Sequence, residues 1–160
     1  MKRIVYIFTI VFFLLTLASC ASLDSQQAKT DKRTAGVNSG AFDAWNDGSL
    51  NNAAISELIK QADMMIKYKQ WDDAQGKLER TLRLSTSYSP AWSRLSWLSL
   101  RAAKFKKAVQ LAHRSNSYTD DRSLKILNWS FIRDAYQLMG DNQEVETANS
   151  MLQRLSETGL

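Results

Sequence analysis

The side chains that most often carry out chemistry in proteins are scarce in this chain of 160 residues. It has one cysteine, Cys20, and one histidine, His113. A Cys–His pair or a Ser–His–Asp triad would depend on His113, yet there is no second histidine and no nucleophile elbow around a serine. One cysteine forms no internal disulfide, and zinc sites with four Cys or His ligands are excluded. We therefore expect no catalytic site and no bound metal, and we interpret His113 as a surface or packing residue.

Two acidic pairs and one glycine also have structural interpretations. Asp72-Asp73 and Asp120-Asp121 each stand at the start of a predicted helix. Carboxylates there favour the positive end of the helix dipole, so capping explains both pairs without a metal. Gly76 falls inside a predicted helix, where glycine costs about 1 kcal/mol relative to alanine. We expect Gly76 to permit close packing of a neighbouring helix.

Cys20 has a more specific chemistry, which follows from the residues before it. Lys2 and Arg3 precede an apolar run over residues 4–17, which ends in Leu17-Ala18-Ser19-Cys20. As a helix this run measures about 21 Å, too short to span a bilayer core of about 30 Å comfortably. The pattern resembles the signal peptide and lipobox of bacterial lipoproteins, which implies cleavage after residue 19 and a covalent lipid on the Cys20 thiol. The alternative is an ordinary signal peptide, or an uncleaved anchor, with a chance cysteine.

Cleavage would change both the charge and the location of the chain. Loss of Lys2 and Arg3 takes away two of the five net positive charges. Charge and compartment therefore argue against a nucleic-acid partner. Several acyl chains bury far more apolar surface than the single chain that gives only marginal membrane binding. Ala21 after the lipobox cysteine implies the periplasmic face of the outer membrane, with no cofactor beyond the lipid.

Residues 20–51 lack any helical or alternating apolar period, and we predict a disordered, lipidated tether there. Phe42 and Trp45 are the exception, because they are two aromatic residues in a polar run. They are either a docking segment, for a partner or for the domain itself, or isolated aromatics in a linker.

From residue 52 to residue 158 the pattern is helical. Apolar residues recur at one-face spacing from Ile55 to Ile66, and Trp71 and Ala74 recur as Phe105 and Ala108. The interval of 34 residues between these pairs is the period of the tetratricopeptide repeat. We predict an all-α array of helical hairpins with six helices in three units. The units are 55–88, 89–122 and, after a three-residue insertion, a third from residue 126; the alternative is an unrelated six-helix bundle.

Arrays of this kind bind protein segments in a concave groove lined by the first helix of each unit. Trp97 is the best candidate anchor in that groove, because Trp and Arg dominate interface hot spots. Alternatively, Trp97 packs on the third unit, or binding uses the convex face and the loop over residues 119–122. The predicted partner-binding residues are Ile66, Lys67, Ser93, Trp97, Leu100 and Arg101.

A closer resemblance lies in residues 91–141. It is carried by Ala91-Trp92-Ser93-Arg94-Leu95, Ser115-Asn116-Ser117, Leu124, the run from Asn128 to Ala135, and Gly140-Asp141. This stretch resembles the small tetratricopeptide-repeat lipoproteins of gammaproteobacteria, which include the Lpo-type outer-membrane activator of a class A penicillin-binding protein.

The resemblance implies a non-enzymatic function. We expect an outer-membrane-anchored periplasmic lipoprotein whose repeat domain binds and stimulates a bifunctional peptidoglycan synthase, with no small-molecule substrate. The alternative is an adaptor that assembles an outer-membrane complex such as a pilus or secretion secretin.

Overall fold

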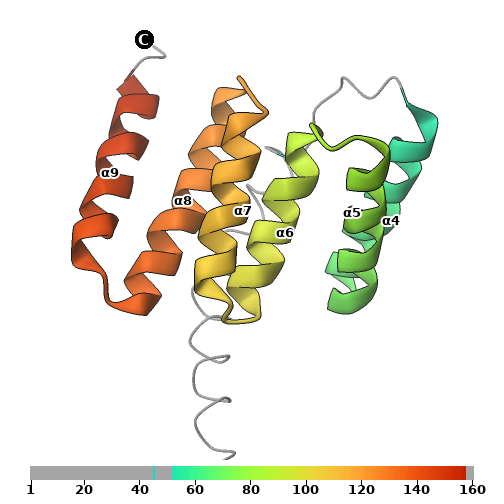
Figure 1. The fold of residues 1–160 in the computed structure, drawn as a ribbon, viewed down its shortest axis with the longest axis horizontal. Coiled ribbons are helices and arrows are strands. Elements are labelled where there is room, and N and C mark those ends of the chain that lie inside the picture. The colour runs from blue at the N-terminus through green and yellow to red at the C-terminus, as the bar shows by residue number, and fades with distance from the viewer. Residues whose placement is uncertain (1–44, 46–51, 158–160) are drawn as a thin grey trace, which may run out of the picture.

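The computed structural model describes Trp45 and residues 52–157, and all regular structure in this part of the chain is helical (Figure 1). The prediction of an all-α array of six helices is confirmed. The predicted signal peptide, Cys20, Phe42 and all of the tether except Trp45 lie outside the described residues. The helices are α4 (Ala53–Lys67), α5 (Trp71–Leu84), α6 (Ser89–Arg101), α7 (Phe105–Ser117), α8 (Arg122–Met139) and α9 (Asn142–Glu157).

Helix α4 shows how the sequence pattern produces the fold. The side chain of Asn52 accepts hydrogen bonds from the backbone N–H groups of Ala54 and Ile55, at 3.0 and 3.4 Å, and so caps the first turn. The residues that α4 buries are spaced three or four positions apart and form one face of the helix. They are Ile55, Leu58, Ile59, Ala62 and Ile66.

The three turns that join paired helices repeat one backbone conformation. Each turn places a residue at positive φ: Lys69 at 60°, Ala103 at 56° and Gly140 at 79°. In each, the N–H of that residue bonds the carbonyl three positions earlier, and the next N–H bonds the carbonyl five positions earlier. The spacing from Lys69 to Ala103 is the predicted 34 residues. The spacing from Ala103 to Gly140 is three residues longer, as the predicted insertion requires.

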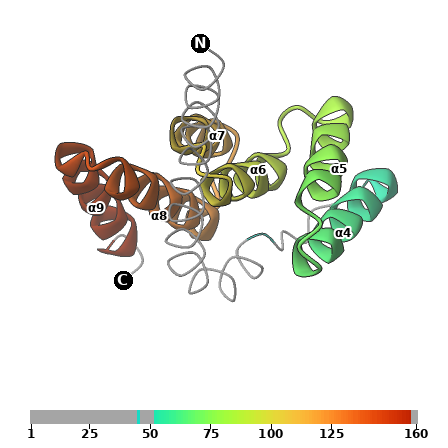
Figure 2. The same ribbon diagram turned by 90° about the horizontal axis from the view of Figure 1, so that it is seen from below.

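The helices form three antiparallel hairpins, α4/α5, α6/α7 and α8/α9, which follow one another in a curved row (Figure 2). Helix α6 is central, and nearly all of its side chains are buried between neighbours. Helix α9 ends the row and buries only Ala148 fully. The first helix of each later hairpin therefore packs on both sides, as in a repeat array.

Close approach between helices depends on alanine, and the expectation for Gly76 is wrong. A Cβ atom built on Gly76 meets no atom within 4 Å, so no neighbouring helix needs the missing side chain. The residues that let the helices approach are alanines without exposed surface, such as Ala74 and Ala108, which occupy equivalent places in two hairpins.

Candidate protein-binding site

The six predicted binding residues lie on α4 and α6, but most of them are buried within this chain. Ile66, Ser93, Trp97 and Leu100 belong to the interior, while Arg101 is half-buried and Lys67 is exposed at the end of α4. Trp97 is thus buried within the chain, but the aromatic rings that it meets are those of Trp71 on α5 and of Trp45, and neither belongs to the third unit that the alternative names.

Trp45 covers the face of α6 that carries Ser93, Arg94 and Trp97, the inner face of this helix. Its indole is only 2% exposed, and its Nε1 donates a hydrogen bond of 2.9 Å to the Ser93 hydroxyl. The edge of one indole meets the face of the other where Trp45 contacts Trp97, with ring centroids 6.2 Å apart. Of the interpretations open for this residue, docking on the domain itself is the one that the structure shows, and isolation in a linker is wrong.

Two arginines complete an aromatic cluster around Trp45 and Trp97. The Arg94 guanidinium lies over the Trp45 ring at 4.8 Å from its centroid. Trp71, the first residue of α5, meets Trp97 edge to face at 5.8 Å, and Arg101 lies over both of these rings at 4.5 and 5.1 Å. Cation–π contacts of this kind gain strength as water is excluded. The cluster thus joins the N-terminal segment, the first hairpin and the second hairpin.

Arg94 is fixed by an ion pair that the sequence did not reveal. Its Nε and one terminal nitrogen donate to the two oxygens of Asp63 on α4, both at 2.8 Å, and another nitrogen donates to the Pro90 carbonyl. The Arg94 side chain is 3% exposed and that of Asp63 is 28% exposed. A planar two-bond pair of this geometry is strong and directional, so it sets the position of α4 against α6.

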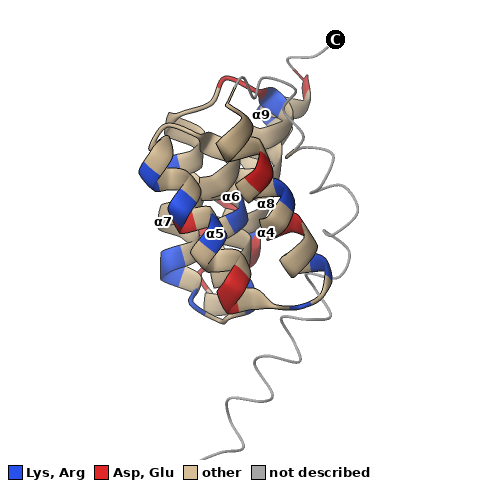
Figure 3. Cartoon of the chain, turned by 90° about the vertical axis from the view of Figure 1, so that its right-hand side faces the viewer, with Lys and Arg blue, Asp and Glu red and all other residues tan. Residues whose placement is uncertain are grey.

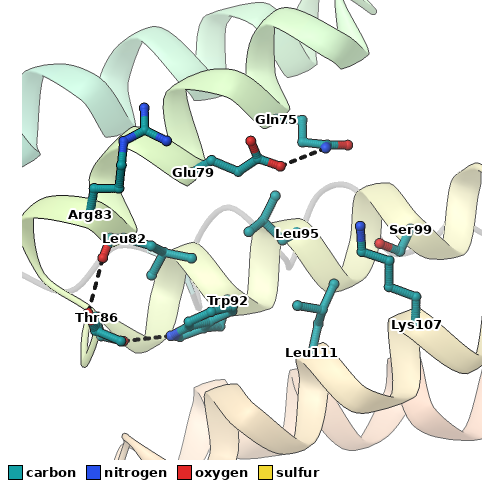
Figure 4. Close-up of a pocket in the computed structure, with 10 residues that line it drawn as sticks. All are labelled: Gln75, Glu79, Leu82, Arg83, Thr86, Trp92, Leu95, Ser99, Lys107 and Leu111. Atoms are coloured by element: carbon teal, nitrogen blue, oxygen red, sulfur yellow. Dashed lines mark hydrogen bonds between the residues drawn. The ribbon is translucent and has the colours of Figure 1, made fainter.

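A cavity of about 390 Å³ opens between α5, α6 and α7 (Figure 4). Leu82, Leu95 and Leu111 line it together with the Trp92 ring, whose Nε1 donates to the Thr86 carbonyl at 2.7 Å. Charged side chains also line it, and Figure 3 shows lysine and arginine segments on α5 and α7 together with acidic ones. The charged residues of the cavity lining are Glu79, Arg83 and Lys107.

A chain of small polar side chains crosses from α6 through α7 to α8. The Ser115 hydroxyl donates to the Ser89 carbonyl at 2.9 Å and accepts from the Asn128 amide at 2.8 Å. The same amide donates to the Asn116 side chain, also at 2.8 Å. Because Ser115 and Asn128 have no exposed surface, these bonds form in a medium of low dielectric and hold the second and third hairpins in register.

His113 and the two acidic pairs, which the sequence also singles out, occupy packing and helix-start positions. His113 packs edge to face on Trp129 of α8 at 5.4 Å, and burial lowers the pKa of its imidazole while the nearby Glu144 carboxylate opposes the shift. Asp121 caps α8 through a 3.0 Å bond from the Leu124 N–H, and the Asp72-Asp73 pair lies in the first turn of α5.

Within residues 45 and 52–157, no group of three His, Cys, Asp or Glu side chains is arranged to hold a metal ion. In the same part of the chain, the helices are too short or too polar to cross a membrane. Comparison of the chain with protein-family models, with curated proteins and with solved structures finds no match.

Proposed function

We propose that this protein is an outer-membrane-anchored periplasmic lipoprotein that binds and stimulates a bifunctional peptidoglycan synthase, a class A penicillin-binding protein. The lipid on Cys20 holds one end of the chain at the membrane, and the helical domain binds the synthase. Stimulation follows if the domain binds the active conformation of the synthase more tightly than the inactive one.

One observation carries the protein-binding part of this proposal. The inner face of α6 already holds a side chain from outside the array, because Ser93 and Trp97 both contact Trp45. Tryptophan and arginine, which meet on this face, are among the residue types enriched in interface hot spots. The lipobox pattern and the resemblance in residues 91–141 support the anchor and the identity of the partner.

The test is recovery of partners from a solubilised envelope extract on the immobilised chain from residue 20 onward, with Cys20 replaced by serine. We expect a class A penicillin-binding protein to be retained and its glycan polymerisation rate to rise when the domain is added. Retention of secretin or pilus proteins without any penicillin-binding protein would instead favour the adaptor function.

A pair of charge reversals locates the binding surface. Lys67, one of the predicted binding residues, is exposed at the end of α4, and Lys106 is exposed at the start of α7. We expect Lys67→Glu to slow association with the synthase and to change its salt dependence, whereas Lys106→Glu leaves both unchanged. Equal effects of the two reversals would place the binding surface elsewhere on the domain.

The anchor has its own test. Cys20→Ser should abolish palmitate labelling of the chain and its cleavage by the lipoprotein signal peptidase. Unchanged labelling in this variant would disprove the lipid attachment without bearing on the synthase.

A further inference from the structure

Trp45 has the surroundings of a bound ligand. It precedes the N-cap residue Asn52 by several residues and belongs to none of the six helices. Its contacts on α6 come from Ser93, Arg94 and Trp97; Ser93 and Arg94 stand four and three positions before Trp97, so all three border one face of the helix.

This face has features that do not depend on Trp45. Asp63 and the Pro90 carbonyl hold the Arg94 guanidinium in place from the side of α4 and α6. Ser93 is buried on the middle of α6, where the helix backbone fixes its position. A site whose groups are positioned in advance loses little side-chain entropy when an indole arrives.

The site also has a donor that Trp45 does not use. Trp97 is 2% exposed, and its Nε1 has no hydrogen-bond acceptor among the residues that the structure describes. A buried donor without an acceptor costs about 1–3 kcal/mol. An acceptor brought to this nitrogen would remove that cost.

We propose that the inner face of α6 is a recognition site for a tryptophan side chain on an extended protein segment. Trp45 fills this site in cis, and a tryptophan-bearing segment of the partner displaces it. This inference rests on the proposed function for the identity of the partner. It adds two things: the partner segment carries a tryptophan, and Trp45 regulates access to the site on α6.

Trp45, bound to α6 of its own chain, competes with any free segment for the site. The short connection from Trp45 to Asn52 keeps the indole at an effective concentration on the order of 1 mM at the site. If the Trp45 segment itself binds the vacant site with an intrinsic Kd of about 100 μM, a competing segment should bind the intact protein about tenfold more weakly than the vacant site.

The chain supplies its own probe for the test, which uses no synthase. A labelled peptide with the sequence of residues 40–49 is titrated by fluorescence anisotropy into the chain from residue 20 onward (Cys20→Ser), and into the same chain with Trp45→Ala. We expect about tenfold tighter binding to the Trp45→Ala chain. Binding should be lost when the tryptophan of the peptide is replaced by alanine.

Two further substitutions in the Trp45→Ala chain locate the peptide. Ser93→Ala should weaken binding severalfold, because the hydroxyl accepts the indole N–H. Lys107→Ala, at the cavity between α5 and α7, is the matched control and should leave binding unchanged. Equal affinity for both chains, equal binding of the peptide without tryptophan, or sensitivity to Lys107→Ala would each overturn the proposal.

A second preparation covers the case in which Trp45→Ala does not fold. A protease site replaces residues 47–50, and the N-terminal piece is cleaved and removed after folding. A domain that remains helical and binds the returned peptide supports the proposal. A domain that unfolds on removal of the piece shows Trp45 to be an integral part of the core and overturns it. Because no synthase is present, these outcomes stay distinct from failure of the pull-down.

Discussion

Tryptophan and arginine side chains fill the junction between the first and second hairpins, whereas buried small polar side chains and the contact of His113 with Trp129 connect the second hairpin to the third. At the first junction, Arg94 reaches across to Asp63 and Trp71 meets Trp97. At the second junction, Ser115 and Asn128 are linked by hydrogen bonds without exposed surface.

The helices are also packed more loosely at the first junction than at the second. Helix α7 packs more extensively on α8 than α5 packs on α6, and the cavity of about 390 Å³ lies at the first junction. Large aromatic and cationic groups bridge a wide gap between helices, while serine, asparagine and alanine allow close approach. The first junction is therefore the one that a further segment such as Trp45 can enter.

The largest loss of stability is expected from Asp63→Ala at the first junction. Removing one partner of a buried ion pair leaves the other charge uncompensated, and we expect a loss of about 3 kcal/mol in the free energy of unfolding. Urea unfolding followed by circular dichroism measures it. Lys125→Ala, which breaks the exposed pair with Asp120, is the control and should cost less than about 0.5 kcal/mol. Similar losses in the two variants would mean that the Arg94 pair contributes no more than a surface contact.

Asn128→Ala probes the second junction. It removes the bonds to Ser115 and Asn116 and leaves a small void, so we expect a loss of about 2 kcal/mol with a single cooperative transition. Urea unfolding gives both the midpoint and the slope. A biphasic transition would show that the third hairpin unfolds separately and that this junction is the weaker of the two.

The hairpin turns provide a comparison that neither junction should influence. Ala103 adopts φ of 56°, which favours glycine, so Ala103→Gly should raise the free energy of unfolding by about 1 kcal/mol. Gly140→Ala should lower it by a similar amount, because φ there is 79° and only the backbone conformation opposes a Cβ. Thermal melts of the two variants should shift in opposite directions; shifts in the same direction would contradict this explanation.

The smallest expected effect is the pH dependence of stability that His113 contributes at the second junction. Burial lowers the pKa of His113 below its ordinary value of 6.5, so the unfolded chain binds a proton more readily than the folded one. Stability should therefore rise with pH through the window between the lowered pKa and 6.5, and this contribution is constant above it. Compared with His113→Gln, the wild-type chain should lose more stability between pH 7.5 and pH 5. Parallel pH curves for the two proteins would rule out this contribution.

Periodicity predicted the helices because burial of one face repeats every three or four residues, and the positions of Ile55 to Ile66 suffice to define α4. The repeat of Trp71 and Ala74 as Phe105 and Ala108 likewise predicted the interval between the first two hairpin turns, which the structure places 34 residues apart. These features depend on local spacing, which the sequence contains directly.

The cluster at the first junction depends on contacts between distant residues, which spacing does not reveal. Arg94 and Asp63 lie on different helices, and Trp45 lies in a run without any period, so no pattern joins them. The residue type of Trp97 predicts an anchor for a partner, yet the structure packs its ring against Trp45 and Trp71. Gly76 was misinterpreted because a glycine within a helix has the same sequence signature whether or not a neighbour approaches it.

The attachment of Trp45 to α6 also decides where a mechanical load enters the domain. If the chain is anchored at Cys20, tension travels along about 25 residues, at most about 85 Å when taut, and reaches the middle hairpin at Ser93 before it reaches the start of α4. Release of Trp45 then adds about seven residues, or about 25 Å, to the reach of the anchored chain. An anchored chain would then have two working lengths, and tension at the membrane would favour the longer one, in which the α6 site is vacant.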